Sequence, residues 1–253
     1  GTDLSRTAER AASSGVPHAF VDLETAVRET GAQLVTIATP PLTHADLTLK
    51  AIALSCHVLC EKPFARDAAE AQKMLDAAQA AGVVHALGNE FRYAPERAMM
   101  GRAIAQGLIG EPRFASLVQL SGFVSAFEED FPDWWYDPSA AGGWLGASGS
   151  HAIDQIRCWL GEFDSLSASL SQVALTRSEV EDSFSLRFRL ASGLEGVLQQ
   201  SSAAMGGKTE IIRVAGSEGS IWIDQGAVYF ADRHGERVLP IDADITLPEP
   251  PSI

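Results

Sequence analysis

The sequence predicts an α/β domain followed by an α+β domain, and two patterns support this division. Between residues 18 and 90, short apolar runs alternate with helical segments, an order typical of strand–helix–strand units on a parallel sheet. After about residue 110, apolar and polar residues alternate with period two between short turns, which is typical of a mostly antiparallel sheet. We place the boundary after residue 92, so the predicted domains are residues 1–92 and 93–253.

The first domain is expected to contain four helices and four strands. The helices are expected at residues 4–14, 22–30, 43–55 and 65–82, and Asp22 and Gly31 are typical cap residues for the second. The run at 33–41 is apolar until two prolines close it, which favours a strand buried on both faces. The four strands are expected at residues 18–21, 33–41, 57–63 and 83–89.

The second domain is expected to consist mainly of strands. One amphipathic helix, residues 149–161, precedes most of them and carries Ile153, Ile156 and Leu160 on one side. The strands are expected at residues 113–125, 164–175, 182–190, 195–203, 209–216, 219–224, 226–232 and 237–241.

The composition argues against several classes of protein. Lys and Arg number 19 against 33 Asp and Glu, so the net charge of −14 disfavours nucleic acid and anionic membrane surfaces as partners. No apolar run is long enough to cross a bilayer. The three cysteines do not form a disulfide framework, and Cys56 and Cys60 are interpreted as core residues, not metal ligands. We therefore expect a cytoplasmic protein without a metal site.

Three polar or turn-forming segments directly follow predicted strands. They are Thr39-Pro40-Pro41, Glu61-Lys62-Pro63 and Gly88-Asn89-Glu90. Ligands bind at the carboxyl ends of the strands in parallel sheets, so these segments are expected to line one rim. Lys62 at such a rim can act as a point charge, a proton donor or a nucleophile. The alternative is a surface lysine paired with Glu61, a contact that would contribute little.

Several ordered motifs resemble those of the Gfo/Idh/MocA family of NAD(P)-dependent oxidoreductases. The central signature combines Ala38-Thr39-Pro40, His44 and Glu61-Lys62-Pro63. Three further stretches are similar to family motifs, namely NEFRYAPERAMM at 89–100, GGWLGASGSHAIDQIRCWLG at 142–161 and VAGSEGSIWID at 214–224. The resemblance covers nearly the whole chain. It implies a partial Rossmann-type parallel sheet followed by a mostly antiparallel open sheet.

The resemblance also implies a role for each matching residue. Lys62 would stabilise the oxygen of the reacting hydroxyl or carbonyl, or relay its proton, as hydride moves. His151 would be the second catalytic group, and Asp154 on the same helical face would orient its imidazole. The residues implied in cofactor binding are Thr39, Pro40, His44, Glu61, Lys62 and Asn89. The residues implied in substrate binding are Arg92, Tyr93, Trp144 and Asp154.

These roles have structural alternatives. His44 is also consistent with packing at a helix start, and His151 with local hydrogen bonding at a helix N-terminus. Tyr93 and Trp144 are equally consistent with packing. The run Trp134-Trp135-Tyr136 fits either a substrate-facing lid or a packed loop.

The sequence departs from the family pattern in two places. Ala147 stands where inositol-type members carry an Asp four residues before the His, so Lys62 and His151 would act alone or the chain would lack dehydrogenase chemistry. No Gly-x-Gly-x-x-Gly motif lies between a strand and a helix, although this loop binds the pyrophosphate in the family. We therefore expect a fragment truncated at both ends that binds NAD or NADP weakly or not at all.

Two expectations concern the sheets. The edge of the predicted strand at 33–41 is expected to be covered by a rearranged segment or by another chain, because a bare apolar edge invites pairing. The antiparallel sheet is expected to be the face through which the protein forms a homo-oligomer, as the resemblance implies.

The leading hypothesis is an oxidoreductase that transfers a hydride between NAD(P) and the CH–OH group of a sugar, cyclitol or related polyol. One alternative keeps the fold but changes the chemistry to that of an NAD-dependent glycosidase. The other is a non-enzymatic regulatory protein that senses a dinucleotide or a sugar. The missing carboxylate at Ala147 favours the sensor, whereas Lys62 and His151 favour an enzyme.

Overall fold

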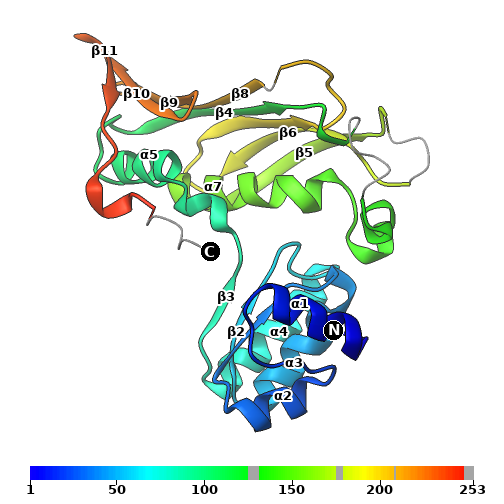
Figure 1. Cartoon of the computed structure of the whole chain (residues 1–253). Helices are drawn as coiled ribbons and strands as arrows, with labels where there is room; N and C mark the ends of the chain where they lie inside the picture. Colours follow the sequence, from blue (N-terminus) through cyan, green and yellow to red (C-terminus); the bar gives the residue numbers. More distant parts are fainter. Residues whose placement is uncertain (125–130, 175–178, 208, 248–253) are drawn as a thin grey trace. The chain divides into compact units, whose positions relative to one another are not determined.

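Two separate sheets organise the computed structural model of the protein (Figure 1). The structure describes residues 1–124, 131–174, 179–207 and 209–247. These residues form two units. The first holds residues 1–88 with 139–141, and the second holds the rest of the described chain.

The first unit contains a three-stranded parallel sheet in the order β1 (Leu34–Ile37), β2 (His57–Cys60) and β3 (His85–Leu87). Leu34 pairs with His57 at one end of the first two strands, and Ile37 pairs with Cys60 at the other. The predicted parallel order of these three strands is confirmed. All three carboxyl ends therefore lie at the same edge of the sheet.

Four helices accompany this sheet, namely α1 (Leu4–Ser13), α2 (Leu23–Thr30), α3 (His44–Ala53) and α4 (Ala68–Ala81). Asp22 and Asp67 cap α2 and α4, since their side chains accept hydrogen bonds from the backbone of the first helical turn. Gly31 and Gly82 end the same two helices in the left-handed conformation, at φ 65°. Helices α3 and α4 enclose the apolar core of the unit with the strands, around residues that include Ile37, Ile52, Val58, Cys60 and Met74.

The predicted strand at 18–21 is wrong, because this segment is a connection between α1 and α2 without strand pairing. Strand β1 is consequently an edge strand that pairs only with β2 among the described residues. Leu34 on this edge is 56% exposed and only Ile37 of the strand is buried, so the prediction of a strand buried on both faces is wrong. The expectation that a rearranged segment of the chain covers the edge is therefore also wrong. Cover by another chain stays a prediction.

The second unit contains an eight-stranded sheet in the order β11-β10-β9-β8-β4-β7-β6-β5. Neighbouring strands are antiparallel except β4 and β7, which run parallel. All eight strands predicted from the period-two pattern are present, and the predicted end residues 125 and 175 of two of them lie outside the described residues. They are β4 (Pro112–Leu120), β5 (Phe163–Ser171), β6 (Ser183–Leu190), β7 (Glu195–Ser201), β8 (Thr209–Gly216), β9 (Ser220–Asp224), β10 (Ala227–Asp232) and β11 (Gly235–Leu239).

Helices α5 (Pro95–Ala105) and α7 (Ser150–Leu160) pack against one face of this sheet (Figure 1). Burial alternates along the strands, as in β6, where Phe184, Leu186 and Phe188 are buried and the residues between them are exposed. The helices thus cover one face and leave the other open to solvent. Short segments complete the unit: η2 (Glu90–Tyr93), η4 (Asp133–Tyr136), η6 (Leu145–Gly149) and η7 (Ala243–Ile245), together with η5 (Pro138–Ala140), which is shared between the units.

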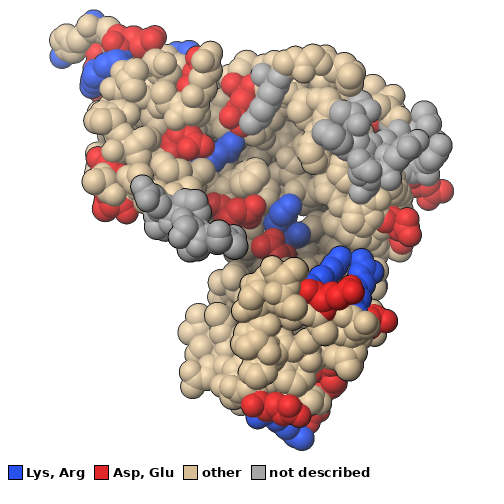
Figure 2. Space-filling view, in the orientation of Figure 1, with Lys and Arg blue, Asp and Glu red and all other residues tan. Residues whose placement is uncertain are grey.

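The surface charge shows no continuous basic area on the face drawn in Figure 2, where Lys and Arg lie beside Asp and Glu in small groups. No helix among the described residues has the length and apolar character needed to span a membrane.

Candidate active site

The three strand tips of the first unit are joined by backbone hydrogen bonds. The amide of Glu61, just after β2, donates to the carbonyl of Ile37 at the end of β1, at 2.9 Å. The amide of Gly88, just after β3, donates to the carbonyl of Cys60 at 2.7 Å. The parallel ladder therefore extends past the ends of the strands. It brings the segments after β1, β2 and β3 together at one rim, as the sequence indicates.

Lys62 lies in the turn that follows β2. Its side chain is half-buried, Pro63 is buried, and the peptide bond between them is cis. The Glu61 carboxylate folds back over the neighbouring tip, so a Cβ added at Gly88 would lie 3.0 Å from Glu61 Oε1. Glycine at 88 thus allows Glu61 to pack directly on the backbone after β3. The β2 turn, with Lys62, is held against its neighbour by this close approach.

His44 is fully buried at the start of α3, at 0% exposure. Its Nε2 lies 2.8 Å from the carbonyl oxygen of Thr39, and its Nδ1 lies 3.3 Å from that of Phe64. The ring therefore connects the segment after β1 with the segment after β2. In this position it cannot reach a ligand in solvent, so the structure favours the packing role of His44 over direct contact with a dinucleotide.

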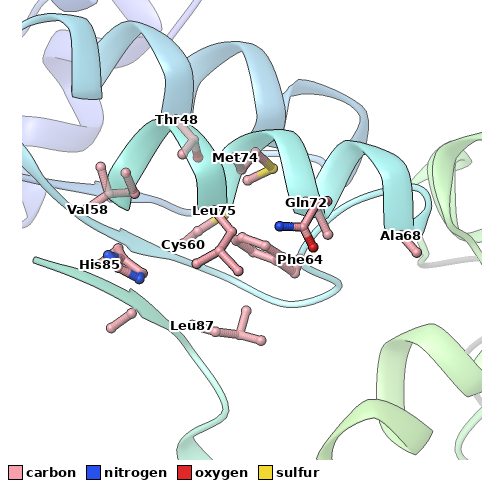
Figure 3. Close-up of a pocket in the computed structure, with 13 residues that line it drawn as sticks. Thr48, Val58, Cys60, Phe64, Ala68, Gln72, Met74, Leu75, His85 and Leu87 are labelled. Atoms are coloured by element: carbon pink, nitrogen blue, oxygen red, sulfur yellow. The ribbon is translucent and has the colours of Figure 1, made fainter. Parts of the chain in front are cut away.

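An apolar pocket of about 340 Å³ lies between α4 and the strands β2 and β3 (Figure 3). Cys60, Phe64, Met74, Leu75 and Leu87 are among its lining residues. Burial raises the pKa of the Cys60 thiol to about 11, so this cysteine stays protonated near neutral pH. Neither Glu61 nor Lys62 lines the pocket. It is thus distinct from the polar rim, and its lining is unsuited to a charged phosphate.

Asn89 follows β3 and is 8% exposed. Its side-chain oxygen Oδ1 has no hydrogen-bond partner among the described residues. A buried amide oxygen without a partner is costly, and a bound group that donates a hydrogen bond would relieve that cost. Asn89 is therefore suited to the cofactor-binding role that the resemblance implies.

Arg92 and Asp154 form a two-pronged ion pair in the second unit. Arg92 Nε donates to Asp154 Oδ2 at 2.8 Å, and its Nη2 donates to Oδ1. The carboxylate raises the pKa of Arg92. Asp154 thus directs both oxygens to Arg92, which corrects the expectation that it orients the imidazole of His151. The paired N–H donors of a guanidinium match the two oxygens of a carboxylate, which makes this charge-assisted contact strong and directional.

His151 lies in the first turn of α7 and is 3% exposed. Its ring is stacked on Phe91, with centroids 3.9 Å apart and an angle of 13° between the planes. Its Nε2 lies 3.9 Å from Glu90 Oε1. Phe91 and Glu90 both belong to η2, so this short segment sets the surroundings of the imidazole. Phe91 lies inside the stretch NEFRYAPERAMM, but no role for it is expected from the sequence.

The remaining candidate site residues of the second unit are either exposed at the surface or packed against other side chains. Tyr93 is 65% exposed, and Ala147 is buried in η6. Trp144 packs in an aromatic cluster, in which its ring centroid lies 5.9 Å from that of Phe123 and 6.4 Å from that of Trp135. Trp134 and Trp135 contact each other in the same cluster at 5.4 Å. Of the two alternatives for this loop, these contacts favour packing.

Comparisons with known proteins cover most of the chain. Residues 2–89 match the family model described as oxidoreductase family, NAD-binding Rossmann fold. Residues 98–222 match the model of the GFO/IDH/MocA C-terminal domain.

Curated relatives include a levoglucosan dehydrogenase from Pseudarthrobacter phenanthrenivorans, which is 28% identical over 92% of this chain and 68% of its own length. A 1,5-anhydro-D-fructose reductase from Ensifer adhaerens is 29% identical over 95% of this chain and 74% of its length. An uncharacterized oxidoreductase from Synechocystis is 27% identical over 87% of this chain and 62% of its length. The chain therefore spans about two thirds of the length of these relatives.

A solved structure of levoglucosan dehydrogenase in complex with NADH and levoglucosan superposes with a TM-score of 0.86. It is 27% identical in sequence, and the match covers 94% of this chain and 68% of that one.

Replacing His44 tests its role as the connection between two strand tips. His44→Leu removes the ring nitrogens that face the carbonyls of Thr39 and Phe64, and we expect the free energy of unfolding to fall by about 1–3 kcal/mol. Urea denaturation followed by circular dichroism measures the change. His18→Leu, at an exposed histidine of the same unit, is the control and should leave stability unchanged. Equal stability of the two variants would contradict the assigned role.

Proposed function

The chain belongs to the Gfo/Idh/MocA family of oxidoreductases, and on that premise we propose that the protein transfers a hydride between NAD(P) and the CH–OH group of a sugar, cyclitol or related polyol. The names of its relatives support this substrate class. They include a levoglucosan dehydrogenase, a 1,5-anhydro-D-fructose reductase and a myo-inositol 2-dehydrogenase.

The observation that carries the proposal is the position of Lys62 at the joined strand tips. The Glu61 amide is bonded to the tip of β1 and the Glu61 carboxylate packs on Gly88, so the Lys62 turn is fixed on both sides. A cationic side chain held at the carboxyl edge of a parallel sheet is suited to stabilise negative charge on a reacting oxygen.

The residues of the rim fit the nicotinamide end of a dinucleotide. Thr39, Pro40 and Glu61 would line it, and the buried Oδ1 of Asn89 would accept a hydrogen bond from it. When bound, the dinucleotide supplies the acceptor or donor of the hydride. The sequence contains no Gly-x-Gly-x-x-Gly motif to bind the pyrophosphate, so weak dinucleotide binding stays a prediction.

The proton chemistry is assigned to this chain's own side chains. Oxidation of a CH–OH group releases one proton from the hydroxyl as the hydride departs. In its ammonium form Lys62 would stabilise the developing alkoxide while His151 or solvent takes the proton, and in its neutral amine form it would accept that proton itself. His151 would supply the second polar group, and Ala147 cannot assist it because its side chain is a methyl group.

A regulatory, non-enzymatic role is the second candidate. The observation that favours it is Ala147, which stands buried in η6 where inositol-type members carry a carboxylate. A protein of this kind would bind a dinucleotide or a sugar without turnover.

The test uses the full-length gene product with a panel of polyols, aldoses and anhydrosugars. Oxidation with NAD or NADP, and reduction of keto sugars with NADH or NADPH, are followed at the nicotinamide absorbance band. We expect turnover with at least one substrate and a fall in kcat of roughly 10²- to 10⁴-fold in Lys62→Ala, the range typical of a general acid–base group. Lys73→Ala, at an exposed lysine of α4, is the matched control.

Three results would overturn the proposal. Dinucleotide binding without turnover of any substrate would favour the regulatory role. Glycoside hydrolysis that needs only catalytic amounts of nicotinamide would favour an NAD-dependent glycosidase. Equal activity of the Lys62 and Lys73 variants would remove Lys62 from the chemistry.

We further propose that the open face of the eight-stranded sheet joins two copies of the chain. Phe114 and Ile211, on neighbouring strands β4 and β8, are 46% and 47% exposed on this face. Val118 is directly opposite Ile211 in the register. Trp222 and Tyr229 continue the face as a stacked pair at 5.6 Å. Exposed and half-buried apolar and aromatic side chains that gather on one face are typical of an interface between subunits.

Light scattering coupled to size exclusion tests this interface. We expect the wild-type protein to have an oligomeric mass, and Ile211→Glu to lower that mass because it places a charge among the apolar side chains of the face. Leu4→Glu, at an exposed leucine of α1, is the control and should keep the wild-type mass. A monomeric wild-type protein at every concentration tested would contradict the proposal.

A further inference from the structure

The imidazole of His151 is oriented by stacking against Phe91. The two ring planes are nearly parallel, at 13°, and their centroids are 3.9 Å apart. A flat contact of this kind restricts rotation of the imidazole, because turning the ring would separate the two faces. Phe91, however, is itself 39% exposed in the short segment η2. A half-exposed ring can fix its neighbour only if something else fixes that ring.

Arg97 is the side chain that contacts Phe91 from α5. Its guanidinium carbon lies 5.5 Å from the centroid of the Phe91 ring, within the range of a cation–π interaction. The Arg97 side chain is 9% exposed. A cation–π interaction is stronger for a desolvated cation than for one in water, so the buried guanidinium of Arg97 is expected to hold the Phe91 ring.

The guanidinium of Arg97 is itself held by two hydrogen bonds. Nη1 donates to Gln155 Oε1 at 2.6 Å, and Nη2 donates to Glu210 Oε1 at 2.8 Å. Gln155 lies on α7 four residues after His151, so it shares a helical face with it. One side chain therefore contacts both the helix that carries His151 and the ring that stacks on His151.

The hydrogen bonds continue beyond Arg97 across the sheet. Glu210 on β8 also accepts from Gln119 Nε2 at 2.7 Å, and Gln119 on β4 accepts in turn from Gln200 on β7. Gln200 is 2% exposed and Gln155 is fully buried. A buried arginine is tolerated only when acceptors satisfy it, and a buried network that does so holds it in one orientation.

We propose that Arg97 is a positioning residue for His151 and acts through Phe91. The guanidinium clamps Phe91 from α5, and Phe91 holds the imidazole in its plane. The kinetic consequence rests on the proposed function of His151, whereas the structural consequence does not. A purely structural arginine would stabilise the unit without changing the position of the imidazole relative to Phe91.

Nuclear magnetic resonance of histidine-labelled protein measures the stack directly. The protein has six histidines, and the variant His151→Gln identifies the signal of His151. The ring current of an aromatic ring shifts a proton above its face upfield. The variant Phe91→Leu therefore gives the chemical shift of the His151 ring protons without the ring current of Phe91. Spectra are recorded at pH 9, where a histidine with the usual pKa of about 6.5 is neutral.

We expect Arg97→Met to move the His151 signal at least halfway towards its position in Phe91→Leu. Methionine retains much of the apolar stem of arginine but removes the charge and both hydrogen bonds. The matched control is Arg102→Met on the same helix, where Arg102 pairs with Asp242 and Asp244, and it should leave the signal unchanged. An unchanged His151 signal in folded Arg97→Met would overturn the proposal.

If Arg97→Met does not fold, the His151 signal of Arg97→Lys tests the positioning role instead. Lysine keeps the charge but cannot reach Gln155 and Glu210 with a planar fork, so a smaller shift in the same direction is expected. No shift in this variant would overturn the proposal.

Steady-state kinetics separates this proposal from the proposed function. We expect Arg97→Met and Phe91→Leu to lower kcat by similar factors, about 10- to 100-fold, with KM for the dinucleotide unchanged. The double variant should be no slower than the slower single variant, because both changes release the same ring. A shifted His151 signal with unchanged kcat would retain the positioning role and remove His151 from the chemistry. Additive losses in the double variant would overturn action through Phe91.

Discussion

The backbone hydrogen bonds between the tips of β1, β2 and β3 are the constraint on which the candidate site depends. The Glu61 and Gly88 amides each donate to the strand before, so three separate turns become one surface. His44 supports the same surface from within, since its two ring nitrogens face the carbonyls of Thr39 and Phe64. The turn that carries Lys62 is held in place by the backbone hydrogen bonds of the sheet.

In the second unit, side-chain contacts hold the candidate catalytic residue His151 in place. His151 is oriented by an aromatic ring, that ring is contacted by a buried guanidinium, and the guanidinium is held by carboxamide and carboxylate oxygens from α7 and β8. The two arrangements differ in what they tolerate. Backbone bonds at strand tips survive most substitutions of side chains, whereas the contacts around His151 depend on the identity of each residue.

The sequence was sufficient for those features that follow from local periodicity. The period-two segments of the second domain all became strands, and the ends of three predicted parallel strands identified the rim with Lys62. The strand prediction for residues 18–21 failed for a physical reason, because a strand needs a neighbouring strand and in the described chain this segment has none.

The partner of Asp154 was missed because it lies 62 residues earlier in the chain, at Arg92. Helical spacing from His151 carries no information about such a long-range competitor. The local sequence does not indicate the contacts of Phe91 and Arg97 near His151 either, because an aromatic residue and a single arginine near a helix start are common.

A crystal structure of the full-length gene product with NAD(P) and a bound polyol tests the central claim most directly. The quantity to measure is the distance from Lys62 Nζ to the oxygen of the carbon that faces the nicotinamide ring. We expect this distance to be within hydrogen-bond reach, about 2.6–3.2 Å, with the nicotinamide lying along the joined tips of β1, β2 and β3. A substrate oxygen far from Lys62, or a nicotinamide bound away from these tips, would contradict it.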